Sequence, residues 1–211
     1  MKPAYDAVIF DLLTALLDSW TLWGRVAGGE ALGRKWRGAY LRRTYQSGNY
    51  RPYLALVAEA AQEVGLPREL AATLAEQYAE VTPWPEANAV LAALRQHVRI
   101  AVVTNCSEEL AAKALAALDG TFDVVVTAER AGYYKPDPHP YRMALAELGV
   151  SVERSLFVAG SHFDLFGTAK VGLSVYWHDR AGTAAAPEQA KLIAHHDSLE
   201  PLVDVVLGRL T

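Results

Sequence analysis

A short apolar run near the start of the chain, Val8-Ile9-Phe10, ends directly at a carboxylate, Asp11. An unbroken apolar run of this length is typical of a parallel strand that is buried on both faces. Asp11 then lies at the carboxyl end of the strand, the edge at which open α/β sheets bind ligands. A carboxylate there can act as a nucleophile and form a covalent intermediate. A turn or helix-capping aspartate would account for the same residue, and the run alone does not separate the two.

Beyond residue 84 the chain alternates helices with short apolar strands. We predict strands at 99–104, 123–127, 155–159, 174–177 and 191–195, and helices at 86–96, 108–118, 140–148, 165–171 and 198–210, the last capped by Ser198. Short strands that alternate with helices predict an α/β fold with a Rossmann-like, doubly wound parallel sheet.

Residues 15–83 have a different pattern, which is helical throughout with no predicted strand. We predict a helix capped by Ser19 and further helices at 35–45, 53–64 and 68–80. The chain of 211 residues is long enough for a core and a smaller inserted unit. We therefore predict an α/β core domain from residues 1–14 and 84–211, and an inserted helical domain from residues 15–83.

The composition argues against several classes of protein. A hydrophobic content of 52% is enough for a packed core, and a net charge of −4 without a basic run argues against a nucleic-acid partner. We find neither a signal-peptide pattern nor an apolar stretch long enough to span a membrane. The one cysteine, Cys106, excludes an intramolecular disulfide and fits a reducing compartment. We therefore expect a soluble, cytoplasmic protein without a membrane partner.

Polar residues follow the other predicted strands as well. Thr104 and Asn105 place a hydroxyl and an amide at the edge of the sheet that carries Asp11, and Ser107 can cap the next helix. Such a helix start with hydroxyl donors suits an anion, although a plain capping motif would have the same sequence. Lys135 stands alone before Pro136 in the run 132–138, Gly-Tyr-Tyr-Lys-Pro-Asp-Pro. The prolines fix this loop, so that the cation can neutralise a carboxylate or a bound anion.

The strand at 155–159 leads into a final polar stretch, Ala-Gly-Ser-His-Phe-Asp, at residues 159–164. Asp164 adds a second carboxylate at the same edge of the sheet, and Ser161 adds a hydroxyl. His162 could serve as an acid or base, but a histidine at this place is more often only a residue at a strand end.

These four strand ends, in order, resemble the four motifs of the haloacid dehalogenase (HAD) superfamily. Residues 10–18, Phe-Asp-Leu-Leu-Thr-Ala-Leu-Leu-Asp, resemble the first motif, F-D-x-D-G-T-L-x-D, and Lys-Pro-Asp-Pro at 135–138 is similar to the third. The resemblance implies a HAD core with an inserted cap domain. It also implies catalytic roles for four residues, with Asp11 as the nucleophile together with Thr104, Lys135 and Asp164.

The departures from these motifs favour one branch of the superfamily. HAD phosphatases use the second aspartate of the first motif as a general acid and base, and Leu13 stands there instead. Mg²⁺ prefers several hard oxygen ligands, and Ala159-Gly160 replaces one expected carboxylate. We therefore expect neither a metal nor another cofactor. If Mg²⁺ were bound, its ligands would be Asp11, the Leu13 carbonyl and Asp164.

The sequence is most similar to the L-2-haloacid dehalogenase branch, which also lacks those carboxylates and reads S-S-N-x-x-D in the fourth motif. The resemblance implies that Asp11 displaces halide from a small acid and that water hydrolyses the ester. Trp36-Arg37 resembles a Trp-Arg pair in the cap whose arginine receives the halide, with Arg42 or Arg43 as alternatives. The implied substrate-binding residues are Leu13, Thr14, Arg37, Asn105, Tyr141 and Ser161.

Two alternative functions stay open at this point. Dehalogenases carry a tyrosine at the place of Leu13 and Gly-Thr at the place of Thr14-Ala15, so the chain is expected to lack a hydroxyl beside the nucleophile unless the loop is shifted by one residue. A Mg²⁺-dependent phosphatase with altered motifs and a non-catalytic binding protein are the alternatives. The tryptophans of residues 20–36 could form a homodimer interface, although packing inside the cap is the favoured explanation for them.

Overall fold

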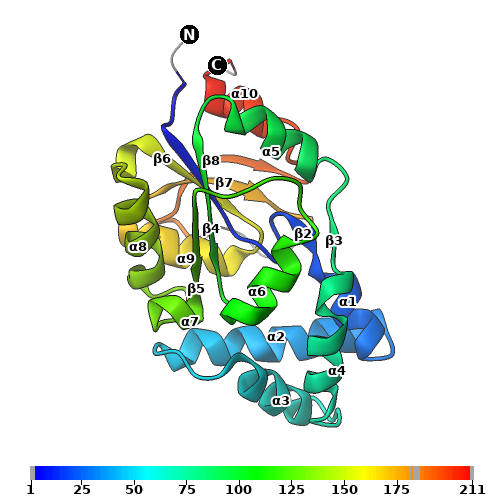
Figure 1. Cartoon of the computed structure of the whole chain (residues 1–211). Helices are drawn as coiled ribbons and strands as arrows, with labels where there is room; N and C mark the ends of the chain where they lie inside the picture. The colour runs from blue at the N-terminus through cyan, green and yellow to red at the C-terminus, as the bar shows by residue number, and fades with distance from the viewer. Residues whose placement is uncertain (1–2, 181, 183–185, 210–211) are drawn as a thin grey trace.

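The computed structural model describes residues 3–180, 182 and 186–209, and within these residues six parallel strands form the central sheet (Figure 1). The strands are β1 (Ala7–Phe10), β4 (Arg99–Thr104), β5 (Val124–Thr127), β6 (Ser155–Ala159), β7 (Ser174–His178) and β8 (Lys191–His196). Their order across the sheet is β5-β4-β1-β6-β7-β8, and each neighbouring pair is parallel. The predicted doubly wound α/β fold is confirmed.

Strand β1 lies at the centre of this sheet because it is apolar on both faces. Its side chains alternate between two hydrophobic layers, with Val8 and Phe10 in one and Ala7 and Ile9 in the other. All four residues are fully buried. The chain leaves β1 toward β4 on one side and returns to β6 on the other, so the topology reverses at the end of β1. Open α/β sheets bind ligands at such a switch point.

Helices cover both faces of the sheet (Figure 1). They are α5 (Ala87–Arg95), α6 (Glu108–Leu115), α7 (Ala128–Ala131), α8 (Pro138–Leu148), α9 (His162–Val171) and α10 (Leu202–Leu207), with a 3₁₀ turn, η2, at Val152–Arg154. Ser107 caps α6 and Gly149 ends α8, as predicted. The predicted helix at 198–210 begins too early, because α10 starts at Leu202 after Pro201. Leu210 lies outside the described residues.

A second group of helices lies at one end of the sheet (Figure 1). It contains α1 (Ser19–Val26), α2 (Glu30–Ser47), α3 (Tyr53–Glu63), α4 (Leu70–Glu76) and the 3₁₀ turn η1 (Gln77–Glu80). Trp23 and Trp36 are buried between α1 and α2 with ring centres 4.7 Å apart, so both pack inside this group rather than on its surface. Helices α1 and α2 approach so closely that a Cβ on Gly33 would overlap the backbone of Gly24.

The prediction of no strand in residues 15–83 is wrong at both ends of that segment. Strand β2 (Leu17–Asp18) pairs antiparallel with β3 (Thr82–Pro83), which gives a short ribbon where the chain enters and leaves the helical group. Two residues per strand show no alternation that a sequence pattern could reveal. The division into a core of 1–14 and 84–211 and a cap of 15–83 stays a prediction. Within the described residues, no helix combines the length and apolarity needed to cross a bilayer.

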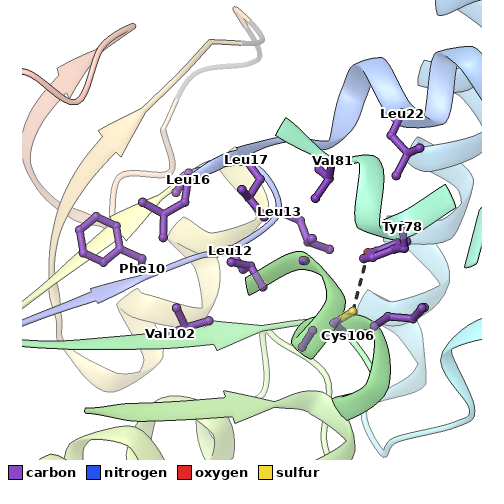
Figure 2. Packing of buried hydrophobic residues seen from close by; sticks show 14 of the residues in the cluster. Phe10, Leu12, Leu13, Leu16, Leu17, Leu22, Tyr78, Val81, Val102 and Cys106 are labelled. Atoms are coloured by element: carbon purple, nitrogen blue, oxygen red, sulfur yellow. Dashed lines mark hydrogen bonds between the residues drawn. The ribbon is translucent and has the colours of Figure 1, made fainter. Parts of the chain in front are cut away.

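One apolar cluster continues from the sheet into the helical group (Figure 2). Phe10 of β1 and Val102 of β4 belong to this cluster, and so do Tyr78 and Val81 from the end of the helical segment. Leu13 lies between these two sets and is 6% exposed. The position at which HAD phosphatases carry an acid therefore belongs here to the hydrophobic core, where an ionised carboxylate would be strongly destabilised.

Candidate active site

The carboxyl ends of β1, β4 and β6 meet at a small cavity of about 40 Å³. The cavity is lined by Asp11, Leu13, Thr14, Arg37, Tyr40, Leu41, Thr44, Tyr45, Thr104, Asn105, Lys135, Ser161, Phe163 and Asp164. Nine of the ten site residues predicted from the sequence are in this lining, and Tyr141 is not. A volume of this size holds a few water molecules, so it suits a ligand of only a few heavy atoms.

Asp11, Lys135 and Asp164 form a buried ion-pair network beside this cavity. The Nζ of Lys135 donates to Asp11 Oδ1 at 2.8 Å and to Asp164 Oδ1 at 2.7 Å. Each of the three residues is at most 6% exposed. Charges so poorly hydrated persist only when they are paired, which explains why one ammonium lies between two carboxylates.

The network separates the acidities of its two carboxyl groups. Burial acts to raise the pKa of Asp11, but the charge of Lys135 and hydrogen bonds from Lys135 and Thr14 hold it below the usual value. Burial, with the charge of Asp11, holds the pKa of Asp164 above the usual value despite the attraction of Lys135. For Lys135 itself, burial acts to lower the pKa, and the two carboxylates more than offset that effect and raise it. Asp11 is therefore the carboxylate most suited to act as a nucleophile at neutral pH.

The side chain of Asn105 orients Lys135 through the main chain. Its amide donates to the Lys135 carbonyl at 3.0 Å, and its Oδ1 accepts from the Lys135 backbone N–H at 2.6 Å. The hydroxyl of Tyr40 on α2 in turn donates to the Asn105 carbonyl at 2.7 Å. Both polar atoms of the Asn105 side chain are thus occupied by the lysine loop.

Thr14 supplies a hydroxyl to the nucleophilic carboxylate. Its Oγ1 donates to Asp11 Oδ2 at 2.6 Å, and its backbone N–H donates to the same oxygen at 3.0 Å. The expectation that Ala15 leaves Asp11 without a neighbouring hydroxyl is therefore wrong. The hydroxyl is present one residue earlier in the chain, because the tight turn after β1 brings Thr14 back to Asp11.

The residues present do not fit Mg²⁺. The Leu13 carbonyl, which was the expected backbone ligand, accepts a hydrogen bond from the Ser19 hydroxyl. The Lys135 ammonium lies between the two carboxylates that would be the other ligands. In the described part of the chain, no three His, Cys, Asp or Glu side chains gather as a metal site. Ser19 was predicted to cap α1, but Asp18 does so, and Ser19 holds the loop after β1 instead.

Of the three candidate arginines, Arg37 reaches the cavity. It is 4% exposed, its guanidinium stacks 4.1 Å from the centre of the Trp20 ring, and its Nη1 has no hydrogen-bond partner among the described residues. Arg42 and Arg43 instead form ion pairs with Glu63. A buried cation with an unused donor in a small cavity is suited to bind an anion.

The cavity has five lining residues that the sequence reasoning missed. Tyr40, Leu41, Thr44 and Tyr45 follow Arg37 at intervals of three, four, seven and eight residues, so they share its face of α2. That spacing was the available signal once Arg37 had been chosen. The fifth is Phe163, whose ring lies 5.6 Å from that of Tyr45 and joins α9 to α2.

Three polar side chains around the cavity differ in what they can contact. Thr104 is in the lining, and its buried Oγ1 has no hydrogen-bond partner in the described part of the chain. Tyr141 is absent from the lining and packs on Phe157, and its hydroxyl also has no hydrogen-bond partner among those residues. Burial, with the charges of the two nearby aspartates, raises the pKa of Tyr141 well above its usual value. His162 is the first residue of α9 and is absent from the lining.

Comparison with known proteins gives the family context of this site. The sequence profile of a family of hydrolases, haloacid dehalogenase-like hydrolase, matches residues 5–172. The chain is 28% identical to (S)-2-haloacid dehalogenase 4A of Burkholderia cepacia over 228 residues, which cover 100% of this chain and 99% of that protein. It is 32% identical to a phosphoserine phosphatase of Thermus thermophilus over 177 residues, 79% of this chain and 66% of that one. A solved structure of a dehalogenase with an intermediate complex aligns with a TM-score of 0.86 and 28% identity over 98% of this chain and 99% of that one.

Proposed function

Because the chain belongs to the haloacid dehalogenase-like hydrolases, we propose that it is a metal-independent enzyme of the 2-haloacid dehalogenase type that acts on a small acid. One observation carries the proposal. An ionised aspartate faces a small cavity that contains cations and unused hydrogen-bond donors, but Leu13 stands where a phosphatase needs its acid. Such a site favours attack on a carbon whose leaving group departs as an anion.

In the first step, Asp11 attacks C2 of an L-2-haloacid. A carbon–oxygen bond forms as the carbon–halogen bond breaks, and the halide leaves with the bonding electrons. No proton has to be supplied, so Leu13 is no obstacle. Lys135 and Thr14 keep Asp11 ionised and hold both of its oxygens, which presents the carboxylate to the substrate in a fixed direction.

The substrate is held by hydrogen-bond donors that are unused in the described part of the chain. Arg37 Nη1 and Thr104 Oγ1 both belong to the cavity lining and have no partner among the described residues. One of these two donors can bind the substrate carboxylate and the other can bind the departing halide. Arg37 also supplies the positive charge that these anions need. The volume of about 40 Å³ restricts the acid to about two or three carbons.

In the second step, water attacks the carbonyl carbon of the Asp11 ester and loses one proton. The bond between that carbon and the ester oxygen then breaks, the second proton of the water passes to the departing oxygen, and the 2-hydroxy acid leaves. We assign Asp164 as the group that takes the proton from this water. Burial acts to raise its pKa, and this effect persists after Asp11 has become an ester, so the ionised carboxylate of Asp164 is a better base than that of an exposed aspartate. Ser161 donates to Asp164 Oδ2 at 3.3 Å and orients it.

The Mg²⁺-dependent phosphatase alternative has one supporting observation, the similarity to a phosphoserine phosphatase. It is disfavoured because the leaving alcohol would need an acid at Leu13 and the metal would need the Leu13 carbonyl, which Ser19 occupies. The binding-protein alternative requires the same cavity but no turnover. One experiment separates the three.

The test is halide release from L-2-chloropropionate in the presence of EDTA. We expect release by the parent protein and by Asp18→Asn, a control that keeps the cap of α1, and none by Asp11→Asn. A single turnover in ¹⁸O-labelled water, with enzyme in excess, should place the label in the peptide that contains Asp11. Absence of halide release by the parent would refute the proposal, and phosphate release that depends on Mg²⁺ would establish the phosphatase.

A further inference from the structure

The geometry around Asp11 points to a coupled pair of residues that the family motifs do not contain. We propose that Thr14 positions the nucleophile and that Gly160 is required because it makes room for Thr14. The inference rests on the proposed function in one respect, namely that Asp11 is the nucleophile. The steric part of it depends only on packing.

Thr14 completes a full set of partners for the Asp11 carboxylate. Oδ1 accepts from Lys135 at 2.8 Å, while Oδ2 accepts from the hydroxyl of Thr14 at 2.6 Å and from its N–H at 3.0 Å. Thr14 is 5% exposed, so this hydrogen bond is shielded from bulk solvent. A short hydrogen bond to a carboxylate of this kind both favours the ionised form and fixes its orientation.

Gly160 allows this arrangement because it has no side chain. A Cβ built on Gly160 would overlap Thr14 Oγ1, the Thr14 carbonyl carbon and the Ala15 nitrogen. Gly160 does not have a positive φ, so the requirement for glycine comes from space rather than from backbone conformation. Its own N–H donates to Asp164 Oδ2 at 3.3 Å, which ties the backbone at this contact to the second carboxylate.

The loop that carries Thr14 is held from behind and cannot shift freely to relieve such an overlap. Trp84 Nε1 donates to the Thr14 carbonyl at 2.9 Å. His178 Nδ1 lies 2.9 Å from the Ala15 carbonyl, and its other nitrogen accepts from Arg180 at 3.0 Å, which assigns the proton to Nδ1. Both carbonyls of the loop are therefore fixed by buried or half-buried side chains.

This packing explains two departures from the dehalogenase pattern as one change. Gly-Thr in the first motif and Ser in the fourth are replaced by Thr14-Ala15 and Gly160. In this chain the side chain at the contact belongs to Thr14 in the first motif, while residue 160 in the fourth motif has none. The hydroxyl of Thr14 is one residue closer in the chain to Asp11 than the threonine of the family motif would be. Neither change is expected to be tolerated without the other.

The positioning role is tested with Thr14→Val, which keeps the shape of the side chain, and Thr14→Ser, which keeps the donor. We expect Thr14→Val to lower kcat for halide release by about ten- to a hundredfold and to move the acidic limb of the pH profile upward, and Thr14→Ser to recover most of the rate. Thr21→Val is the matched control, because Thr21 donates to Asp18 in the same way, at 2.7 Å, outside the cavity. A parent-like rate and pH profile for Thr14→Val would overturn the role.

The coupling is tested by thermal unfolding of four proteins: the parent, Gly160→Ser, the double variant Thr14→Gly/Ala15→Thr, and the combination of all three changes. We expect the melting temperature to fall in the first two variants. We also expect Gly160→Ser to lower it less in the Thr14→Gly/Ala15→Thr background than in the parent, because the overlap with Thr14 Oγ1 is then removed while the overlaps with the backbone atoms stay. Additive losses in the combination, or a stable Gly160→Ser, would refute the coupling. The unfolding measurements give this answer even if the parent releases no halide, a result that would refute only the proposed function.

Discussion

Lys135→Met tests whether the ammonium of Lys135 offsets the free-energy cost of burying the two carboxylates of Asp11 and Asp164. Methionine keeps most of the length of the side chain but removes the hydrogen bonds of 2.8 and 2.7 Å to Asp11 and Asp164. Removing one partner from a buried ion pair leaves an uncompensated charge and costs about 3–5 kcal/mol of unfolding free energy. For a domain of this size, that corresponds to a fall in melting temperature of about 6–20 °C near neutral pH.

The pH dependence of this loss has a defined sign. Without the ammonium, burial should place the pKa of both carboxyl groups above the unfolded value of about 3.9, so the variant is most stable below that pH and loses stability as the pH rises. The parent keeps the contribution of Lys135, whose folded pKa is raised, at every pH below about 10.4, and loses it above the folded pKa. The difference between parent and variant should therefore be large from pH 6 to 9 and shrink toward pH 4.

Thermal unfolding followed by circular dichroism at pH 4.5, 7 and 8.5 measures both effects. Lys113→Met is the matched control, because Lys113 pairs with Glu109 at 2.7 Å on the exposed face of α6. That change should lower the melting temperature by less than about 2 °C at each pH. A loss for Lys135→Met no greater than that of the control, or a loss that grows toward acid pH, would refute the charge-pairing argument.

Two further predictions concern activity. Arg37→Gln should lower kcat/KM for a small 2-haloacid by about ten- to a hundredfold, since it removes a buried, charged donor from the cavity. Arg43→Gln should stay close to the parent, because Arg43 pairs with Glu59 and Glu63 outside the cavity. Equal effects of the two substitutions would contradict the assignment of Arg37. The rate of halide release in a single turnover should be flat from about pH 5 to pH 9, because the pKa of Asp11 is lowered, that of Lys135 is raised, and the base Asp164 acts only after the halide has left. Single-turnover kinetics across that range, with a control for unfolding, would expose a midpoint near neutrality that the site does not predict.

The sequence was enough to predict the residues that meet at the sheet edge. Asp11, Thr104 and Asp164 each follow an apolar strand, and parallel strands bring their carboxyl ends together, so topology alone makes them neighbours. Lys135 needed the motif as well, because a lone lysine in a loop is equally consistent with a solvent-exposed position. Once Arg37 is chosen, helix spacing also predicts the other lining residues of α2, since they lie on the same face of that helix.

The interactions that depend on local backbone geometry were beyond the sequence. The hydroxyl of Thr14 reaches Asp11 only because the turn after β1 folds back. Comparison with the motif had indicated that a hydroxyl was missing, because Ala15 stands where the family has threonine. Ser19 was predicted to cap a helix, whereas its hydroxyl donates a hydrogen bond to the carbonyl of Leu13. Tyr141 has the expected spacing from Lys135, but its ring packs on Phe157 and does not line the cavity.

Under the proposed mechanism, the charges of this site change in the order that the chemistry needs. While Asp11 is ionised, its charge raises the pKa of Asp164, and Lys135 is shared between them. Forming the ester removes the charge of Asp11 and leaves the ammonium facing Asp164 alone, so the pKa of Asp164 should fall and its ionised form should be favoured. Asp164 thus becomes an available base at the moment when water must attack the ester. Hydrolysis then restores the Asp11 carboxylate, whose charge raises the pKa of Asp164 again and repels the carboxylate of the acidic product, which favours release of that product.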